Sequence, residues 1–318
     1  MERFESRAIR LARSISSGLA WISNPGGYRQ EVDVALPNFM LIGAGKAGST
    51  SLWHYVVQHP DVFPPKQKEP SYFWTYKHSR PGKAETLEAY QSLFEGSEPF
   101  KAVGDASPTY LADENAPHEI RKMIPDVKLI AILRDPCARA FSDFMMHRMR
   151  QDEPEERFLD AVAADPSRPI DHRLNYIETG LYHKHLSRYL SVFPAGQLKV
   201  VLNDDLKGEP KEVMKDVFEF LGLDADVAID TDVEFNVSGV PKIKALHWLL
   251  TKNHSIKRGL LPLLPKGLIK SLRRAKNANL ERQFMTPQER AALLPSFEAD
   301  ILELEKLLGR DLSHWRTV

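Results

Sequence analysis

Short, strongly apolar segments separated by stretches of helical pattern restrict the fold of this chain more than any other feature. Four segments are apolar enough to be strands covered on both faces: residues 38–43, 101–104, 127–133 and 198–202. Helical pattern lies between them, as in residues 49–58 and in the segment that begins near Pro136. Buried strands that alternate with helices predict an α/β fold, a single domain with a central, mostly parallel sheet flanked by helices.

Two helices near the C-terminus are marked by their end signals. Glu209-Pro210 opens the first helix, and Gly222 stands at the position of its C-cap. Thr286-Pro287-Gln288-Glu289 is a capping box with proline at the first helical position. It predicts one helix that runs to Leu308-Gly309.

Patterns of charge and turn residues divide the chain. Residues 1–30 have the pattern of a basic amphipathic helical segment, and the turn formers Asn24-Pro25-Gly26-Gly27 close it. Such a helix packs on its own protein, on a partner subunit or on a membrane surface. Residues 37–318 form the domain itself. Within that domain, residues 252–282 carry nine Lys and Arg against the single acid Glu281, which predicts a basic helical flap.

Composition excludes several classes of protein. Lys and Arg number 43 and Asp and Glu number 43, so the 318 residues carry no net charge, unlike a typical nucleic-acid binder. Cys137 is the single cysteine, which excludes an internal disulfide and a Cys-rich metal site and favours the cytoplasm. No apolar run reaches the roughly 18 residues of a membrane-spanning helix. Any membrane contact is therefore peripheral, through residues 1–30 or 252–282.

The strongest chemical signal is a glycine-rich turn between the first predicted strand and the next helix, Gly43-Ala44-Gly45-Lys46-Ala47-Gly48-Ser49-Thr50. Glycines let the backbone turn sharply, and the free N–H groups of a helix start attract an anion. The Lys46 ammonium and two hydroxyl groups add to that attraction. We expect a phosphate cradle made of Gly45, Lys46, Ala47, Gly48, Ser49 and Thr50. It is not a Walker A motif, because Lys46 precedes the last glycine by two residues.

A second candidate anion site follows another predicted strand. Arg134 would lie at the carboxyl edge of the sheet, where open α/β sheets bind ligands, and can bind a phosphate through two hydrogen bonds. Ser142, two turns into the following helix, could supply a hydroxyl group. The alternative is a weak surface ion pair, of Arg134 with Asp135 or of Arg139 with Asp143. Together with the glycine-rich turn, the pair predicts a ligand with two separated phosphates.

A third candidate is the segment Lys66-Gln67-Lys68-Glu69-Pro70-Ser71-Tyr72-Phe73-Trp74. Pro70 favours an extended backbone at Glu69, and the aromatic neighbours predict a partly desolvated carboxylate. Desolvation raises the basicity of a carboxylate, which suits a general base. The alternative is a loop of solvated charges. The eleven histidines lack the spacing of a helical zinc site, so we expect no metal.

At these positions the chain resembles sulfotransferases that use 3′-phosphoadenosine 5′-phosphosulfate (PAPS) as donor, over about residues 37–318. The segment that begins at Pro37 and ends at Leu52 is similar to the 5′-phosphosulfate loop of the family. Arg134 and Ser142 match its 3′-phosphate pair. Lys68-Glu69-Pro70-Ser71-Tyr72-Phe73 resembles the heparan sulfate and bacterial carbohydrate branch, in which a glutamate at the position of Glu69 is the proposed base.

The resemblance implies a P-loop-like enzyme that moves the sulfuryl group of PAPS to a hydroxyl or amine of a carbohydrate-like acceptor. Glu69 would take the proton of the acceptor and Lys46 would stabilise the leaving oxygen, without a metal. The implied acceptor is a glycan, a glycolipid or a small molecule. The anchor and disulfide of Golgi relatives are not recognisable, which favours a bacterial cytoplasmic enzyme, as a monomer or a homo-oligomer. Residues 235–242 are the candidate replacement for an Arg-Lys-Gly clamp over the adenosine.

The residues themselves leave two other functions open. A nucleotide-dependent phosphotransferase could use the same glycine-rich turn, and it would require magnesium. A non-catalytic protein could bind nucleotides or anionic glycans through the basic residues 252–282. If Glu69 is not the base, His54 and Asp105 are the next candidates.

Overall fold

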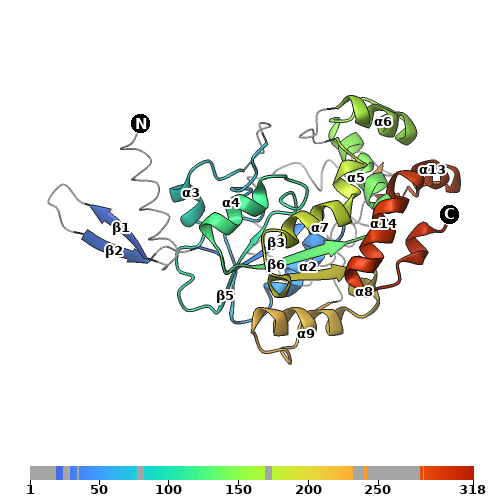
Figure 1. The fold of residues 1–318 in the computed structure, drawn as a ribbon. Coiled ribbons are helices and arrows are strands. Elements are labelled where there is room, and N and C mark those ends of the chain that lie inside the picture. Colours follow the sequence, from blue (N-terminus) through green and yellow to red (C-terminus); the bar gives the residue numbers. More distant parts are fainter. Residues whose placement is uncertain are drawn as a thin grey trace.

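The core of the molecule is a five-stranded parallel sheet with helices on both faces (Figure 1). The computed structural model describes residues 36–76, 82–168, 174–231 and 283–318, together with the backbone of four short strands at 19–23, 29–33, 240–241 and 280–281. The sheet strands are β3 (Phe39–Gly43), β4 (Val62–Phe63), β5 (Ala102–Ala106), β6 (Lys128–Leu133) and β7 (Leu198–Leu202). The predicted α/β fold class is therefore confirmed.

The order of the strands places a reversal of chain direction beside β3. The spatial order is β4–β5–β3–β6–β7, and every neighbouring pair is parallel. From β3 the chain first builds β4 and β5 on one side, and then β6 and β7 on the other. A crevice opens at such a switch point, outside the carboxyl ends of the strands, and open α/β sheets bind their ligands there.

The predicted strands are apolar because helices cover both faces of the sheet. Residues 40–42 and 129–133 are completely buried. In Figure 1, α9 lies on one side of the sheet, where it packs against α2, and α4 and α7 lie on the other. The helices are α2 (Ser49–Val56), α3 (Leu87–Gln91), α4 (Ala116–Met123), α5 (Pro136–Arg150), α6 (Phe158–Ala164), α7 (Tyr182–Leu190), α8 (Asn203–Gly208), α9 (Pro210–Leu221), α13 (Pro287–Leu293) and α14 (Pro295–Leu308). Short 3₁₀ turns occupy Asp165–Ser167, Glu178–Gly180, Ala195–Gln197 and Ser313–Arg316.

The C-terminal end signals are confirmed, with one correction. Gly222 ends α9 in the left-handed conformation, and the Thr286 capping box is formed in full. The single helix predicted from residue 287 to 308 is instead two helices, α13 and α14, that meet at Leu294. Pro295 causes the break, because proline has no N–H to continue the helical hydrogen bonds, although Leu294 itself keeps helical φ and ψ.

The helical segment predicted for residues 1–30 is wrong at residues 19–23 and 29–30, which lie in strands. Strands β1 (Leu19–Ser23) and β2 (Arg29–Asp33) pair antiparallel there, and residues 1–18 lie outside the described residues. Proline and glycine between two short segments are as typical of a hairpin connection as of a helix end. The predicted helical flap 252–282 also lies outside the described residues, except that residues 280–281 form strand β9, paired with β8 (Val240–Pro241).

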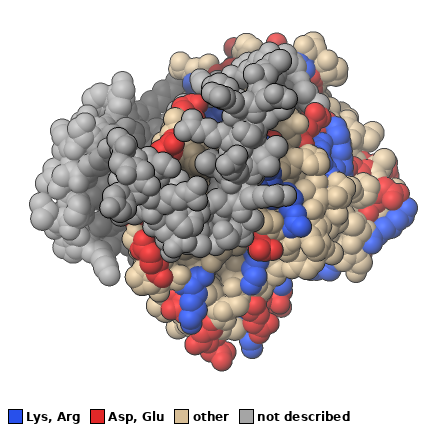
Figure 2. All heavy atoms as spheres, turned by 60° about the vertical axis from the view of Figure 1, so that its left-hand side comes forward, with Lys and Arg blue, Asp and Glu red and all other residues tan. Residues whose placement is uncertain are grey.

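Charged residues of both signs are mixed on the surface. The described part of the face in Figure 2 shows Lys and Arg interspersed with Asp and Glu, in line with the zero net charge. Recognition of a charged ligand must therefore depend on a local arrangement. Among the helices that the structure describes, none is both long and apolar enough to cross a membrane.

Candidate active site

All five strands of the sheet deliver polar residues to one edge, because parallel strands end on the same side. These residues are Lys46 after β3, Glu69 after β4, Ser107 after β5, Arg134 after β6 and Asn203 after β7. This edge is also the switch point of the sheet. The topology thus gathers candidate residues that are far apart in the sequence.

The glycine-rich turn is supported on one side and open on the other. Gly48 has φ 102°, and a Cβ atom there would lie 2.5 Å from Nδ2 of Asn203. That nitrogen donates a hydrogen bond of 2.9 Å to the carbonyl oxygen of Ala47 and so holds the turn against the end of β7. A Cβ atom added at Gly45 would meet no other atom within 4 Å. The turn therefore faces open space at Gly45, where a ligand can approach the backbone.

Arg134 lies directly against this turn. Its Nη1 donates a hydrogen bond of 3.2 Å to the carbonyl oxygen of Lys46. The two candidate anion sites therefore contact each other at Arg134 and Lys46. Asp135, the alternative partner of Arg134, instead caps α5 by accepting from the N–H of Ala138 (3.1 Å) and pairs with Arg290 (2.7 Å). Ser142 lies two turns into α5, partly buried.

The ion pair of Arg139 with Asp143 does form, but it is not a surface pair. The atoms Nη1 and Oδ2 are 3.0 Å apart, and the side chains are only 2% and 13% exposed. Nη2 of Arg139 also donates to the carbonyl oxygen of Tyr176 (2.6 Å). This pair consequently belongs to the structural support beneath α5.

The cations at the sheet edge are partly removed from water. Burial lowers the pKa of Lys46, the nearby Asp143 opposes that shift, and Arg150 and Arg134 add to it. Burial also lowers the pKa of Arg134. Holding two desolvated cations together is unfavourable unless a negative charge joins them. The arrangement therefore suits an anionic ligand with more than one charge.

Lys68 is a third cation of the site, and the sequence analysis did not assign it a role. Its Nζ donates to Oγ1 of Thr50 (2.8 Å) and lies 3.3 Å from Oε1 of Glu69. Burial lowers the pKa of Lys68, and the charge of Glu69 opposes that shift. Lys68 thus connects the loop after β4 to the glycine-rich turn. In the sequence, only its position next to Glu69 indicated that Lys68 could belong to the site.

The backbone of Glu69 differs from the predicted conformation. The backbone is left-handed, with φ 60°, and not extended as Pro70 predicted. A hydrogen bond from the N–H of Glu69 to the carbonyl oxygen of Ala106 (3.1 Å) holds the loop against the end of β5, and this tertiary contact overrides the local preference. The side chain is 44% exposed, so it is about half buried, and the partial desolvation of its carboxylate stays a prediction. The aromatic Phe73 packs inward, against Tyr90 and Tyr110.

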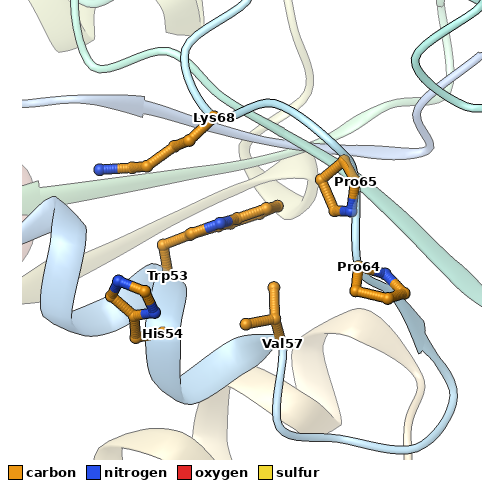
Figure 3. Close-up of a pocket in the computed structure, with 6 residues that line it drawn as sticks. All are labelled: Trp53, His54, Val57, Pro64, Pro65 and Lys68. Carbon is orange, nitrogen blue, oxygen red and sulfur yellow. The ribbon is translucent and has the colours of Figure 1, made fainter. Parts of the chain in front are cut away.

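The two alternative bases lie in different surroundings. Asp105 is 1% exposed and accepts hydrogen bonds from three hydroxyl groups, so it is not accessible to an acceptor. His54 instead lines a recess of about 320 Å³ between α2 and the loop after β4 (Figure 3). The other lining residues are Trp53, Val57, Pro64, Pro65 and Lys68. In Figure 3 the Trp53 ring lies between Lys68 and Val57, with the two prolines opposite. The recess therefore adjoins the site at Lys68.

Tyr182 is a further residue of this region that the sequence analysis did not single out as functional. It is completely buried at the start of α7, and burial raises its pKa, against the opposing charges of Arg139 and Arg134. The expected adenosine clamp at residues 235–242 lies outside the described residues, except for strand β8. Within the ranges that the structure describes, no three His, Cys, Asp or Glu side chains lie close enough to hold a metal ion.

The strand order and the partly buried cations at a glycine-rich turn define an α/β protein with a candidate anion site at its switch point. The profile of the sulfotransferase domain family matches residues 36–258, more than half of the chain, so the protein belongs to that family. The expected family is therefore confirmed.

Similar proteins agree with this assignment. The chain is 32% identical over 211 residues to mouse heparan sulfate glucosamine 3-O-sulfotransferase 3B1, covering 66% of this chain and 52% of that protein. It is 30% identical over 201 residues to human bifunctional heparan sulfate N-deacetylase/N-sulfotransferase 3, covering 59% of this chain and 22% of that protein. The chain thus spans between about a fifth and half of these relatives. The crystal structure of a sulfotransferase from Alicyclobacillus acidocaldarius superposes with a TM-score of 0.68 at 30% identity, over 89% of this chain and 100% of that one.

Proposed function

We propose that this protein transfers the sulfuryl group of PAPS to a hydroxyl or amine of a carbohydrate-like acceptor. The observation that carries the proposal is the contact of Arg134 with the Lys46 turn, which unites two candidate anion sites at the switch point of the sheet. PAPS carries negative charge at both its 3′-phosphate and its 5′-phosphosulfate. A donor with two anionic ends accounts for cations delivered by two adjacent strands.

The residues of the turn fit the 5′ end of this donor. The open side of Gly45 and the start of α2 at Ser49 offer backbone N–H groups to an anion, and Thr50 adds a hydroxyl group. Arg134 and Ser142 would hold the 3′-phosphate. Donor binding supplies the counter-charge that the desolvated Lys46 and Arg134 need.

Lys46 has the position of a group that stabilises the departing nucleotide. PAPS supplies an activated sulfuryl group joined to phosphate through a bridging oxygen, on which charge builds as the bond to sulfur breaks. A partly buried ammonium stabilises such charge more strongly in the transition state than in the bound donor. Lys46 would therefore act mainly on turnover.

Glu69 is the proposed general base. Its carboxylate is 44% exposed, so an acceptor can reach it, and its pairing with Lys68 ties it to Thr50 of the glycine-rich turn. A base held beside the turn can take the proton of a hydroxyl or amine while that atom attacks sulfur in line. The Trp53 ring and two prolines line the recess beside Lys68, and a sugar ring can pack against them. Heparan sulfate, named for both relatives described above, supports a glycan acceptor.

The direct test is transfer from radiolabelled PAPS, in the presence of EDTA, to N-desulfated heparan oligosaccharides, chitooligosaccharides and simple phenols. We expect labelled glycan, and a loss of about 100-fold or more in Glu69→Gln, which keeps the shape but removes the base. Glu98→Gln, an exposed carboxylate outside the site, is the matched control and should keep the wild-type rate. Phosphate transfer from ATP that requires magnesium would show a phosphotransferase instead. Salt-sensitive glycan binding without any sulfate transfer would show a binding protein.

A further inference from the structure

A buried carboxylate lies beneath the Glu69 loop, and the proposed reaction does not use it. Asp105, in β5, is 1% exposed. It accepts hydrogen bonds from Oγ of Ser107 (2.7 Å) and from the hydroxyl groups of Tyr90 and Tyr110 (both 2.9 Å). Burial raises its pKa to about 6, and the three hydroxyl donors oppose that shift. Near neutral pH the group is therefore mostly ionised and can accept from all three donors.

The hydrogen bonds of Asp105 continue to the backbone of the loop. Because Ser107 donates its hydroxyl proton to Asp105, its oxygen is free to accept, and the N–H of Ser71 donates to it at 3.0 Å. The Tyr110 hydroxyl likewise accepts from the N–H of Phe73 (3.3 Å) while it donates to Asp105. The carboxylate thus fixes the direction of two hydroxyl groups, and these in turn fix two backbone N–H groups of the loop.

The loop needs this support because its backbone is strained. Glu69 and Ser71 have φ values of 60° and 52°, in the left-handed region that non-glycine residues avoid. Each such residue costs on the order of 1–3 kcal/mol and persists only where surrounding contacts over-determine it. These contacts include the hydrogen bond from the N–H of Glu69 to Ala106, the bond from the N–H of Ala84 to the carbonyl oxygen of Pro70 (2.8 Å), and the relay of Ser107 with Asp105. Strain of this kind is concentrated at functional sites.

We propose that Asp105, acting through Ser107, is a positioning residue that holds the left-handed turn at residues 69–71 and thereby directs the Glu69 carboxylate toward the acceptor side of the site. The inference rests on the proposed role of Glu69 as the base. Asp105 itself does not touch the substrate. Its effect on Ser71 passes through the Ser107 hydroxyl group, whereas the Tyr110 hydroxyl reaches Phe73 further along the loop. Removing the Ser107 hydroxyl should therefore loosen the turn at Ser71, while the N–H of Glu69 keeps its bond to Ala106.

The first experiment follows the amide of Ser71 by hydrogen exchange in Ser107→Ala. We expect its exchange to accelerate about tenfold, because it loses its acceptor. The same variant should release 3′-phosphoadenosine 5′-phosphate (PAP) from PAPS, with water as acceptor, about 10- to 100-fold more slowly, at an unchanged KM for PAPS. Asp105→Asn should also accelerate the Ser71 exchange and slow the release of PAP. It replaces Ser107→Ala in the experiment if that variant folds poorly.

A matched control separates positioning from general loss of stability. Tyr176→Phe removes another buried hydroxyl group, which donates to Glu153 at 2.6 Å and is not part of the active site. It should destabilise the protein but leave both the Ser71 exchange and the PAP release rate as in the wild type. Loss of PAP release in this control at the level of Ser107→Ala would overturn the proposal, because stability alone would then explain the effect.

A double-mutant cycle with Glu69→Gln shows where the effect acts. If Ser107 acts through Glu69, Ser107→Ala should change the rate of the Glu69→Gln enzyme by less than about twofold. An equal loss in both backgrounds, or an unchanged Ser71 exchange in Ser107→Ala, would overturn the proposal. A wild-type rate in Glu69→Gln alone would instead refute the base assignment, while the Ser71 exchange would still show whether the relay holds the turn.

Discussion

Lys46 differs from the other two cations at the sheet edge, Lys68 and Arg134, in how the fold holds it. Lys68 is paired with Glu69, and Arg134 donates to the turn itself. Lys46 lies within the turn at φ 66°, and burial lowers its pKa. A side chain held in this strained and partly desolvated position is suited to respond to charge that forms during the reaction.

Replacing Lys46 should therefore separate turnover from binding. We expect Lys46→Ala to lower kcat by about 100- to 1000-fold, as expected for loss of a group that stabilises transition-state charge, with a change of only a few fold in the Kd of PAP. Steady-state kinetics and calorimetric titration measure the two effects. Lys66→Ala, an exposed lysine of the loop after β4, is the control. Wild-type turnover in Lys46→Ala would refute the assignment.

The raised pKa of Asp105 predicts how the stability of the protein changes with pH. Burial raises its pKa to about 6 from an ordinary value of 3.8. Between these values the folded protein keeps a proton that the unfolded chain has lost, so this group makes the free energy of unfolding fall as pH rises from about 4 to about 6. Relative to Asp105→Asn, the wild type should lose on the order of 3 kcal/mol of unfolding free energy as pH rises from about 4 to about 6. Urea unfolding at several pH values measures the difference, and a constant difference would contradict the assigned pKa.

Some residues of the candidate active site could be predicted from the sequence, and the conformation of others could not. The glycines, Lys46 and Arg134 could be singled out because each follows an apolar strand, and parallel strands must end at one edge. The left-handed backbone of Glu69 could not be predicted, because it depends on a carbonyl oxygen at residue 106 and a hydroxyl group at residue 107. These contacts bring together residues more than 30 positions apart, which no local pattern encodes.

At the scale of elements, the glycine-rich turn has two sides with opposite tolerance for substitution. Gly48→Ala would place a methyl group against Asn203 in a backbone conformation that alanine avoids, so we expect a loss of roughly 1–3 kcal/mol in unfolding free energy. Gly45→Ala meets open space and should leave stability nearly unchanged. It should still weaken PAP binding, because the methyl group enters the cradle. Thermal unfolding and PAP titration distinguish the two variants.

The reverse pattern would contradict the orientation of the turn. If Gly45→Ala unfolds the protein while Gly48→Ala keeps both stability and PAP affinity, the open side of the turn is not where the donor binds.

The elements that were predicted well are those with a strong local cause. Four strands were recognisable because they are apolar, although only β3, β5 and most of β6 are fully buried and the edge strand β7 is buried only at its last two residues. Helix α9 was recognisable because its end signals are complete. Strand β4 has only two residues, too few to form a pattern. The break at Leu294 was not predicted, because the capping box and the final glycine indicated one continuous helix. Pro295 divides that helix in the structure.

At the scale of the whole molecule, function depends on which strands are neighbours. The sequence predicts a parallel sheet but does not give the order β4–β5–β3–β6–β7. That order makes β3 and β6 adjacent, and so brings Arg134 to Lys46 across 88 positions of sequence. It also brings Asn203, directly after the last strand, to Ala47. The central claim is therefore that one site at this edge holds both phosphate groups of one nucleotide.

Equilibrium binding of PAP and of 5′-AMP, which lacks the 3′-phosphate, tests that claim most directly. In calorimetric titrations with EDTA present, we expect the wild type to bind PAP at least about tenfold more tightly than 5′-AMP, because a charged hydrogen bond contributes about 1.5–3 kcal/mol. Arg134→Ala should lose most of this preference and keep its affinity for 5′-AMP. Equal affinity of the wild type for both nucleotides, or a preference that survives in Arg134→Ala, would contradict the account.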